Sequence, residues 1–315
     1  MDRDRFPVSI DGRDLELSNL DKLMYPAAGF TKGEVIDYYT RIAPVILPHL
    51  ADRAVTRIRY PNGVDGAHFF EKNKPGGTPD WVRLETLPVP GSTKSRETID
   101  FVVVDDLPTL VWLANLAALE LHTPQWKIGA DPDLLVVDLD PGAPAGLREC
   151  CAVAVLVRDR LAEDGIDAYP KTSGKKGMQL CCPISGEQDS ETVSGYAKKV
   201  AEELEALVPK SITAKMAKNL RPGKVFIDWS QNAAAKTTVA PYSLRAQPTP
   251  TASTPLTWEE VEAVAIGEEP ARQYDAREVL DRVAAHGDLL ADLLTPGPRV
   301  PWSGRAKSPP MPPRR

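Results

Sequence analysis

The 315-residue sequence has no apolar run long enough to cross a membrane as a helix, and it offers little for disulfide or zinc chemistry. Its four cysteines form two adjacent pairs, Cys150-Cys151 and Cys181-Cys182, without a CxxC spacing or a Cys/His cluster. We therefore expect buried or half-buried free thiols. Residues 1–5 are charged, and no apolar core of a secretory signal follows them, so we expect a cytoplasmic protein.

The sequence also lacks internal repeats and a Walker A motif, GxxxxGK[ST], and its net charge of −6 does not by itself indicate a nucleic-acid partner. The charge is unevenly distributed, however. Between Leu207 and Arg245 the chain has seven basic residues and one acid, Asp228, whereas the acidic excess lies elsewhere, notably at residues 259–269. Because an acidic protein can bind a polyanion through one basic segment, nucleic acid stays a candidate ligand.

Strand and helix patterns follow one another in the order expected of an α+β domain with a small central sheet flanked by helices. Candidate capping boxes at Thr31/Glu34 and Thr257/Glu260 predict two helix starts, and Pro44 should bend or interrupt the first helix. The other expected elements are strands near 8–17 (with a turn at Asp11-Gly12), 54–60, 101–104, 134–139, 168–169, 178–183 and 225–229, and helices at 107–121, 145–163 and 190–207.

We expect one domain over residues 1–294 and a tail over residues 295–315. The tail is rich in proline, carries basic residues and has no acid, a composition typical of disorder. Within the domain, residues 247–255 are rich in Pro, Thr and Ser and indicate a connecting loop. A helical region should follow that loop and continue to about Leu294.

The sequence VVDLDPG at residues 136–142 carries two aspartates at the end of an apolar strand. Side chains at i and i+2 of a strand project from one face, so Asp138 and Asp140 should point the same way. Two close carboxylates repel each other, and a divalent cation such as Mg²⁺ or Mn²⁺ removes that conflict. The structural alternative is that Asp140 merely begins an Asp-Pro turn.

Asp228, in the sequence FIDW, is the single acid of the basic segment. It is either the ion-pair partner of a nearby basic side chain or a third metal ligand that the fold brings beside Asp138 and Asp140. Three carboxylates can hold two cations, as in polymerases, and the basic residues would then bind phosphates. Between these acids, KTSGKKG at residues 171–177 offers glycine backbone, Ser173 and lysines to an anion, although a solvated hairpin explains the same pattern.

Taken in order, DLDPG at 138–142, SGKKG at 173–177 and IDWSQN at 227–232 resemble the three catalytic motifs of the archaeo-eukaryotic primase superfamily. The sequence is most similar to the polymerase domain of bacterial ligase D and its stand-alone primase-polymerase relatives. Further matching stretches are NLDK (19–22), TKGEVIDYY (31–39), RYPNGVDG (59–66), FFEKN (69–73), ELH (120–122) and KTTVAPYSLR (236–245). The resemblance extends from about Leu17 to about Leu294 and implies the α+β primase-polymerase fold.

The resemblance also implies roles for the matching residues. The metal-binding catalytic triad corresponds to Asp138, Asp140 and Asp228. The implied nucleotide-binding residues are Ser173, Lys176, Gln179, His122, Gln231 and Arg245. The implied DNA-binding residues are Lys22 and Lys32, which grip the 5′-phosphate across a gap, Phe69 and Phe70, which stack on template bases, and Arg221, which lines the cleft.

This sequence departs from the family pattern at two positions. The second motif usually ends with a histidine that helps to bind the nucleotide, whereas Met178-Gln179 stands here. Gln179 can donate a hydrogen bond but carries no charge at any pH, so nucleotide affinity or sugar choice can differ from the relatives. The usual asparagine pair after the third motif is reduced to Asn232-Ala233.

The resemblance thus implies a template-directed polymerase or primase that fills short gaps and extends broken ends in non-homologous end joining. It implies two Mn²⁺ or Mg²⁺ ions, NTP or dNTP substrates with ribonucleotides favoured, and gapped or broken double-stranded DNA with a 5′-phosphate, in the cytoplasm at the nucleoid. Ku and a separate ATP-dependent DNA ligase are the expected protein partners. The ligase is expected because the KxDG motif of such enzymes is absent from this sequence.

Two other functions compete with this prediction. A glycosyltransferase could use the two aspartates of DLD to hold a nucleotide sugar, but it would not need the basic segment around Asp228. A non-catalytic DNA end-binding protein could have kept the fold and lost turnover, with Gln179 as the lesion. Retention of all three aspartates argues against that second alternative.

Overall fold

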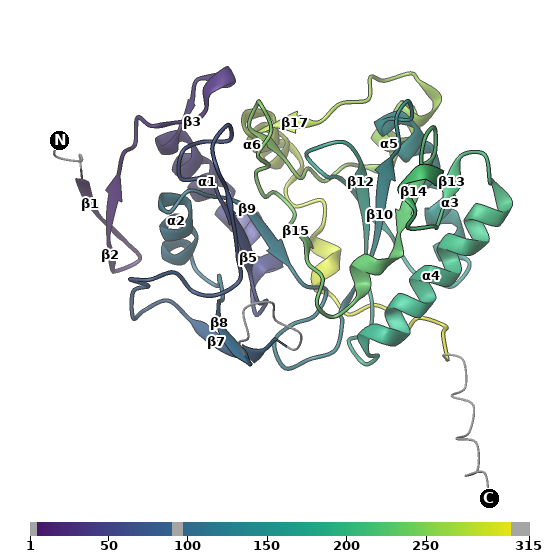
Figure 1. Ribbon diagram of the computed structural model, residues 1–315, viewed down its shortest axis with the longest axis horizontal. Coiled ribbons are helices and arrows are strands. Elements are labelled where there is room, and N and C mark those ends of the chain that lie inside the picture. The colour runs from purple at the N-terminus through teal and green to yellow at the C-terminus, as the bar shows by residue number, and fades with distance from the viewer. Residues whose placement is uncertain (1–4, 90–96, 304–315) are drawn as a thin grey trace, which may run out of the picture.

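The structure, a computed structural model, describes residues 5–89 and 97–303, and its elements gather around two β-sheets, one in each half of the view in Figure 1. The first sheet has the strand order β15-β9-β5-β6, and the second has the order β11-β12-β10-β14-β13. Helices combined with separate, mostly antiparallel sheets confirm the predicted α+β class. In the part of the chain that is described, no helix is both long and apolar enough to cross a bilayer.

Helices cover the first sheet and share its apolar core. α1 (Lys32–Leu50) begins at the predicted capping box of Thr31 and Glu34. Its Tyr39 donates its hydroxyl hydrogen to the carbonyl oxygen of Leu119 at 2.6 Å, which joins the helix to the sheet. The other main elements of this half are β5 (Thr56–Arg59), β6 (Phe69–Glu71), α2 (Leu107–Asn115), β9 (Ala118–Thr123), β15 (Thr238–Val239) and α6 (Ala276–His286).

In the second sheet, β10 (Leu134–Pro141) is the central strand and separates two environments. Val137 and Leu139 point into a core shared with the helices of this half, so Asp138 and Asp140 project from the opposite face. The other elements of this half are α3 (Leu147–Ala162), β11 (Tyr169–Thr172), β12 (Met178–Pro183), α4 (Ser190–Leu207), β13 (Ile212–Thr213), β14 (Val225–Asp228) and α5 (Trp258–Ile266). All four cysteines are buried free thiols, as predicted.

Short hairpins and turns complete the fold. The first hairpin turns at Asp11-Gly12 as predicted, and both of these residues have positive φ. The paired strands are β1 (Arg5–Ile10) with β2 (Arg13–Ser18), β3 (Leu23–Tyr25) with β4 (Phe30–Thr31), β7 (Leu84–Pro88) with β8 (Thr98–Val102), and β16 (Thr251–Ala252) with β17 (Tyr274–Asp275). The 3-10 turns are η1 (Pro26–Ala28), η2 (Lys218–Leu220), η3 (Trp229–Asn232) and η4 (Ala291–Leu294).

The chain returns from the second half to the first after β14. β15 pairs with β9, and the segment that follows runs between the two sheets. Ser253 and Thr254 in this segment are buried, and the backbone N–H of Thr172 donates to the carbonyl oxygen of Thr254 at 2.8 Å. The prediction of a connecting loop at 247–255 is therefore wrong in part. This stretch contains β16 and packs between the two sheets, and we call it the inner seam.

One predicted helix is wrong in its bounds, and another is not interrupted where the sequence allowed a break. The helix expected at 107–121 ends at Asn115, Ala117 adopts a positive φ of 60°, and the chain continues as β9. Residues 107–119 form one largely apolar run, and such a run does not distinguish a buried strand from a buried helix. α1 continues uninterrupted through Pro44, because its buried apolar face holds the helix against the core.

The last described segment also differs from the prediction. The helical region after residue 257 is divided into α5, α6 and η4. Residues 295–303, expected to be disordered, pack against the second half: Val300 is buried, and its N–H donates to Gln188 Oε1 at 2.7 Å. Residues 304–315 of the predicted tail lie outside the described residues.

Candidate active site

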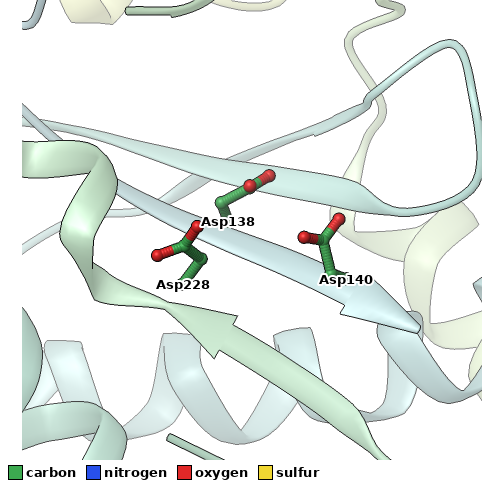
Figure 2. A group of neighbouring side chains, drawn as sticks. All are labelled: Asp138, Asp140 and Asp228. Atoms are coloured by element: carbon green, nitrogen blue, oxygen red, sulfur yellow. The ribbon is translucent and has the colours of Figure 1, made fainter. Parts of the chain in front are cut away.

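Three carboxylates meet on the face of the second sheet that is turned away from its helical core. Asp138 and Asp228 are opposite each other in the antiparallel pairing of β10 and β14, and Asp140 follows two residues along β10. A carboxylate oxygen of each lies within 4.8 Å of the others, and Figure 2 shows the three side chains on the same side of their strands. An all-carboxylate donor set at this spacing fits Mg²⁺ or Mn²⁺.

The electrostatics of the cluster favour a cation. Burial, together with the Asp140 and Asp228 carboxylates, raises the pKa of Asp138 to about 7, although a hydrogen bond from Gln179 opposes the shift. Burial and the charge of Asp228 also raise the pKa of Asp140, against the nearby positive charge of Arg221. Because the charged forms of Asp138 and Asp140 are disfavoured, a divalent cation beside them would relieve the conflict.

A row of three polar side chains, Asp138, Gln179 and Lys171, crosses the second sheet. β12 places Gln179 opposite Asp138, and β11 places Lys171 opposite Gln179. Gln179 Nε2 donates to Asp138 Oδ1 at 2.9 Å, and Lys171 Nζ donates to Gln179 Oε1 at 2.5 Å. The Lys171 ammonium also donates to the carbonyl oxygen of Val239 at 3.0 Å and to Ser253 Oγ at 2.8 Å. The glutamine predicted to bind nucleotide thus contacts a candidate metal ligand.

The turn after β14 holds the third aspartate. Asp228 Oδ1 accepts a hydrogen bond from the Ser230 hydroxyl at 2.6 Å, and its Oδ2 accepts one from Gln231 Nε2 at 2.8 Å. Buried Asn232 donates to the carbonyl oxygen of Val136 at 2.8 Å and accepts from its N–H at 2.9 Å. Asn232, the one asparagine that remains of the pair usual in the family, therefore holds this turn to β10.

The loop between β11 and β12 packs directly on β10. The N–H of Ser173 donates to the carbonyl oxygen of Gly177 at 3.0 Å, and the Ser173 hydroxyl accepts from the N–H of Gly177 at 3.2 Å. A Cβ at Gly177 would lie 2.0 Å from the carbonyl oxygen of Leu139, so only glycine allows this approach. Lys175 and Lys176 are exposed, and no ion pair within the described residues engages them.

Glu120 of β9 gathers two of the predicted nucleotide-binding side chains. Its Oε2 lies 2.9 Å from His122 Nε2 and 3.2 Å from Arg245 Nε, and its Oε1 accepts from the N–H of Ala246 at 3.0 Å. Arg245 Nη1 donates to the carbonyl oxygen of Ser173 at 3.0 Å, which joins this cluster to the second sheet. Burial opposes ionisation of Glu120, but these partners outweigh it and lower its pKa to about 2.

The two lysines predicted to grip a 5′-phosphate are neighbours in the fold. The N–H of Lys32 donates to the carbonyl oxygen of Lys22 at 2.8 Å. Exposed Lys22 donates to Asn62 Oδ1 at 3.0 Å, whereas buried Lys32 donates to the carbonyl oxygen of Ser18 at 2.5 Å. Burial and the charge of Lys22 lower the pKa of Lys32 to about 8. Two like charges this close, neither in an ion pair with a described residue, favour an anionic ligand.

The predicted template-stacking residues are exposed rather than part of the core. Phe69 and Phe70 are 52% and 58% exposed on the edge strand β6. Because neighbours on a strand project to opposite faces, Phe69 shares the face of Arg59, and Phe70 shares that of Ile58. The two rings therefore lie on opposite faces of this edge.

Arg221, predicted to line the cleft, lies beside the aspartates. Its guanidinium stacks 3.7 Å over the Phe226 ring, and its Nη2 donates to the carbonyl oxygen of Met216 at 2.9 Å. Its charge opposes the rise in the pKa of Asp140, so it belongs to the electrostatic surroundings of the cluster.

Two buried charged residues, Lys171 and Glu120, were missed as individual contributors by sequence reasoning. Glu120 left a signal, since it stands between Leu119 and Leu121 in an apolar stretch. No sequence pattern indicated the role of Lys171, because its three hydrogen-bond acceptors come from three different parts of the chain.

Comparison with known proteins identifies the family. The LigD primase-polymerase domain model matches residues 31–290. The multifunctional non-homologous end joining protein LigD of Mycolicibacterium smegmatis is 43% identical over 289 residues, which are 90% of this chain and 36% of that protein. The bifunctional non-homologous end joining protein LigD of Bacillus subtilis is 34% identical over 281 residues, which are 89% of this chain and 44% of that protein.

A solved structure agrees with these sequence matches. The polymerase domain of Mycobacterium tuberculosis ligase D in complex with DNA aligns with a TM-score of 0.84 and 41% identity, covering 90% of this chain and 99% of that one. The chain thus spans less than half of the curated relatives named above, but nearly all of a solved polymerase domain. It belongs to the LigD primase-polymerase domain family, and with it to the DNA-directed nucleotidyltransferases.

Proposed function

We propose that this chain is a template-directed polymerase that fills short gaps and extends broken DNA ends in end-joining repair. The main support is the meeting of Asp138, Asp140 and Asp228 across β10 and β14 at a spacing that suits divalent metal. A polymerase domain solved in complex with DNA is 41% identical, which supports DNA as the substrate. The names of the curated relatives support a role in non-homologous end joining.

The three carboxylates would hold two Mg²⁺ or Mn²⁺ ions. Bound there, the ions would activate the primer 3′-hydroxyl and neutralise the departing pyrophosphate. The chain itself prepares the ligands: Gln179 fixes one oxygen of Asp138, and Gln231 fixes one oxygen of Asp228. Preorganised ligands lose little freedom when a cation enters the site.

The incoming NTP or dNTP would bind between the two sheets, next to the aspartates. Lys176 is exposed at the loop and would supply positive charge to the triphosphate, with the Ser173 hydroxyl beside it. His122 of the first sheet and Arg245 of the segment after β15 would reach it, since Glu120 holds both. Gln231 and Gln179 would complete the site with amide hydrogens. On the resemblance to the family, ribonucleotides would be the favoured substrates.

The DNA would contact two lysines, two exposed phenylalanines and Arg221. Lys22 and Lys32 would bind the 5′-phosphate on the far side of a gap, because their paired charges lack an acidic partner among the described residues. Phe69 and Phe70 would stack on template bases, which any base satisfies. Arg221 would line the cleft beside Asp140.

The chain would act in the cytoplasm at the nucleoid, together with other repair proteins. An ATP-dependent DNA ligase would complete the repair, since residues 1–315 hold no KxDG motif for nick sealing. Ku, bound to the broken ends, would be the second partner.

Primer extension tests this proposal. The substrate is a short-gapped duplex with a downstream 5′-phosphate, supplied with Mn²⁺ and either rNTPs or dNTPs. We expect template-matched extension by the wild type and none by Asp228→Ala, because the third carboxylate is lost. Asp281→Asn, at an exposed acid of α6, is the matched control and should extend normally.

Absence of extension by the folded wild-type protein, with tight binding that requires the 5′-phosphate, would contradict the proposal. That result would favour a non-catalytic DNA end-binding protein. The substitution Gln179→His would then test whether the departure in the second motif is the cause.

A further inference from the structure

We propose that Lys171 is a positioning residue of the metal site: acting through Gln179, it fixes the orientation of Asp138 and ties the site to the first sheet. The inference rests on the proposed function, because it concerns how this chain prepares its metal ligands. Neither Lys171 nor Gln179 needs to touch a metal ion for this role.

Strand register puts the three side chains in line. Lys171 pairs with Gln179 across β11 and β12, and Gln179 pairs with Asp138 across β12 and β10. Directly opposed residues of antiparallel strands project from the same face with their Cβ atoms about 5 Å apart. The row is therefore a consequence of the sheet itself, and a one-residue slip of β12 would break it.

The chemistry of the end groups sets the direction of the row. An ammonium can only donate hydrogen bonds, so Lys171 Nζ must face the carbonyl oxygen of the Gln179 amide. This turns Gln179 Nε2, the donor, towards Asp138 Oδ1. With that oxygen engaged, Asp138 Oδ2 has no hydrogen bond to any described residue. The row thus selects which oxygen is presented to a cation.

Lys171 is anchored firmly enough to orient its neighbour. Its side chain is 1% exposed, and Nζ has three acceptors: Gln179 Oε1, the Val239 carbonyl oxygen and Ser253 Oγ. Val239 belongs to β15 of the first sheet, and Ser253 lies in the inner seam between the sheets. A buried ammonium is costly unless its hydrogens are paired, and here each of the three has a partner.

The departure from the family pattern gives this contact its particular form. The residue usual at position 179 is histidine. Like a neutral histidine, glutamine carries a donor and an acceptor on one planar group, but it cannot be protonated and so keeps its acceptor for Lys171 at any pH. Gln179 can therefore join a cation on one side to a carboxylate on the other. The structure assigns the glutamine to holding a metal ligand, in addition to any contact with nucleotide.

Metal affinity tests the proposal without relying on turnover. Calorimetric titration with Mn²⁺ would compare the wild type with Lys171→Met, Gln179→Leu, the double variant and Lys199→Met, a half-buried control on α4. We expect each single variant of the row to bind Mn²⁺ roughly 10-fold more weakly, as for other groups that orient metal ligands. The double variant should be no weaker than the weaker single variant, because both changes break the same chain of contacts.

Kinetics should separate positioning from general damage. In primer extension the Mn²⁺ concentration for half-maximal rate should rise in Lys171→Met, while kcat at saturating Mn²⁺ recovers. Gln179→Glu keeps an acceptor for Lys171 but cannot donate to Asp138, so it should weaken Mn²⁺ binding as well.

Several results would overturn the inference. One is wild-type Mn²⁺ affinity in folded Lys171→Met, and another is additive losses in the double variant. If circular dichroism shows Lys171→Met to be unfolded, Gln179→Leu decides: unchanged affinity sinks the proposal. A wild type that extends primers while all variants bind Mn²⁺ normally refutes only this inference, whereas a wild type that neither extends primers nor binds Mn²⁺ refutes the proposed function too.

Discussion

Glu120 lies between His122 and Arg245, with contacts of 2.9 and 3.2 Å, and touches no predicted substrate position itself. Gln at this position keeps the size of the side chain but removes the charge that holds both neighbours. We expect Glu120→Gln to raise the KM for the nucleotide about 10-fold, equivalent to ~1.4 kcal/mol, with a smaller change in kcat.

Steady-state primer extension at varied nucleotide concentration measures this effect. Glu269→Gln, at an exposed acid beyond α5, serves as the control. An unchanged KM in Glu120→Gln would mean that His122 and Arg245 do not depend on this carboxylate for their positions.

Single residues also mark how far the sequence leads towards the site. Asp138 and Asp140 could be placed on one face from the strand period alone, and Asp228 was noticeable as the single acid of a basic segment. The pairing of Asp138 with Asp228 could not be derived from the sequence, because it depends on which strands become neighbours. The role of Lys171 could not be predicted for the same reason, since its contact with Gln179 also depends on the strand register.

Among the elements, the loop between β11 and β12 has the tightest backbone contact with the site. An added Cβ at Gly177 would lie 2.0 Å from the carbonyl oxygen of Leu139. That oxygen is a backbone atom of β10, so it cannot move away as a flexible side chain would. We expect Gly177→Ala to destabilise the protein by about 1–3 kcal/mol and to weaken nucleotide binding, because the loop must lift off β10.

Urea unfolding and nucleotide titration of Gly177→Ala check this prediction. Gly76→Ala is a suitable control, since a Cβ there would meet no atom within 4 Å. Equal stability of the two variants would contradict the close approach of loop and strand.

Some elements were predicted to the residue and others were not, for identifiable reasons. α4 and β12 match their predicted bounds, because a clear amphipathic pattern defines the helix and a compact apolar run defines the strand. The expected helix at 107–121 contains a chain reversal that the pattern did not indicate, since α2 and the first two residues of β9 form one largely apolar run. Only tertiary packing distinguishes these two segments.

On the scale of the whole molecule, Asp288 joins segments from distant parts of the chain. Its carboxylate lies 2.8 Å from His49 Nε2 of α1 and accepts a hydrogen bond from the Tyr242 hydroxyl at 2.6 Å. Burial opposes its ionisation, but these two partners outweigh burial and hold the pKa of Asp288 below its ordinary value. The charged form is therefore the one that stabilises the fold.

The sign of the pH dependence follows from this lowered pKa. The contribution of Asp288 is fully present above the unfolded value of about 3.9, and it is lost as the pH falls through the lower folded value. We expect Asp288→Asn to reduce the free energy of unfolding at pH 7, by an amount that shrinks as the pH falls below about 3.9. Urea unfolding from pH 7 to pH 3 measures it, and a deficit independent of pH would contradict the assignment.

The return of the chain after β14 bears on how this protein can be divided. A fragment that ended between the halves, near residue 130, would lack β15 and also α6, whose Ala276 and Val279 complete the core around α1. Neither half is a contiguous stretch of sequence, so neither can be exchanged, inherited or expressed as an independent module. A split-protein design would have to place its cut at a surface turn within one half, such as Gly76-Gly77, rather than between the two halves.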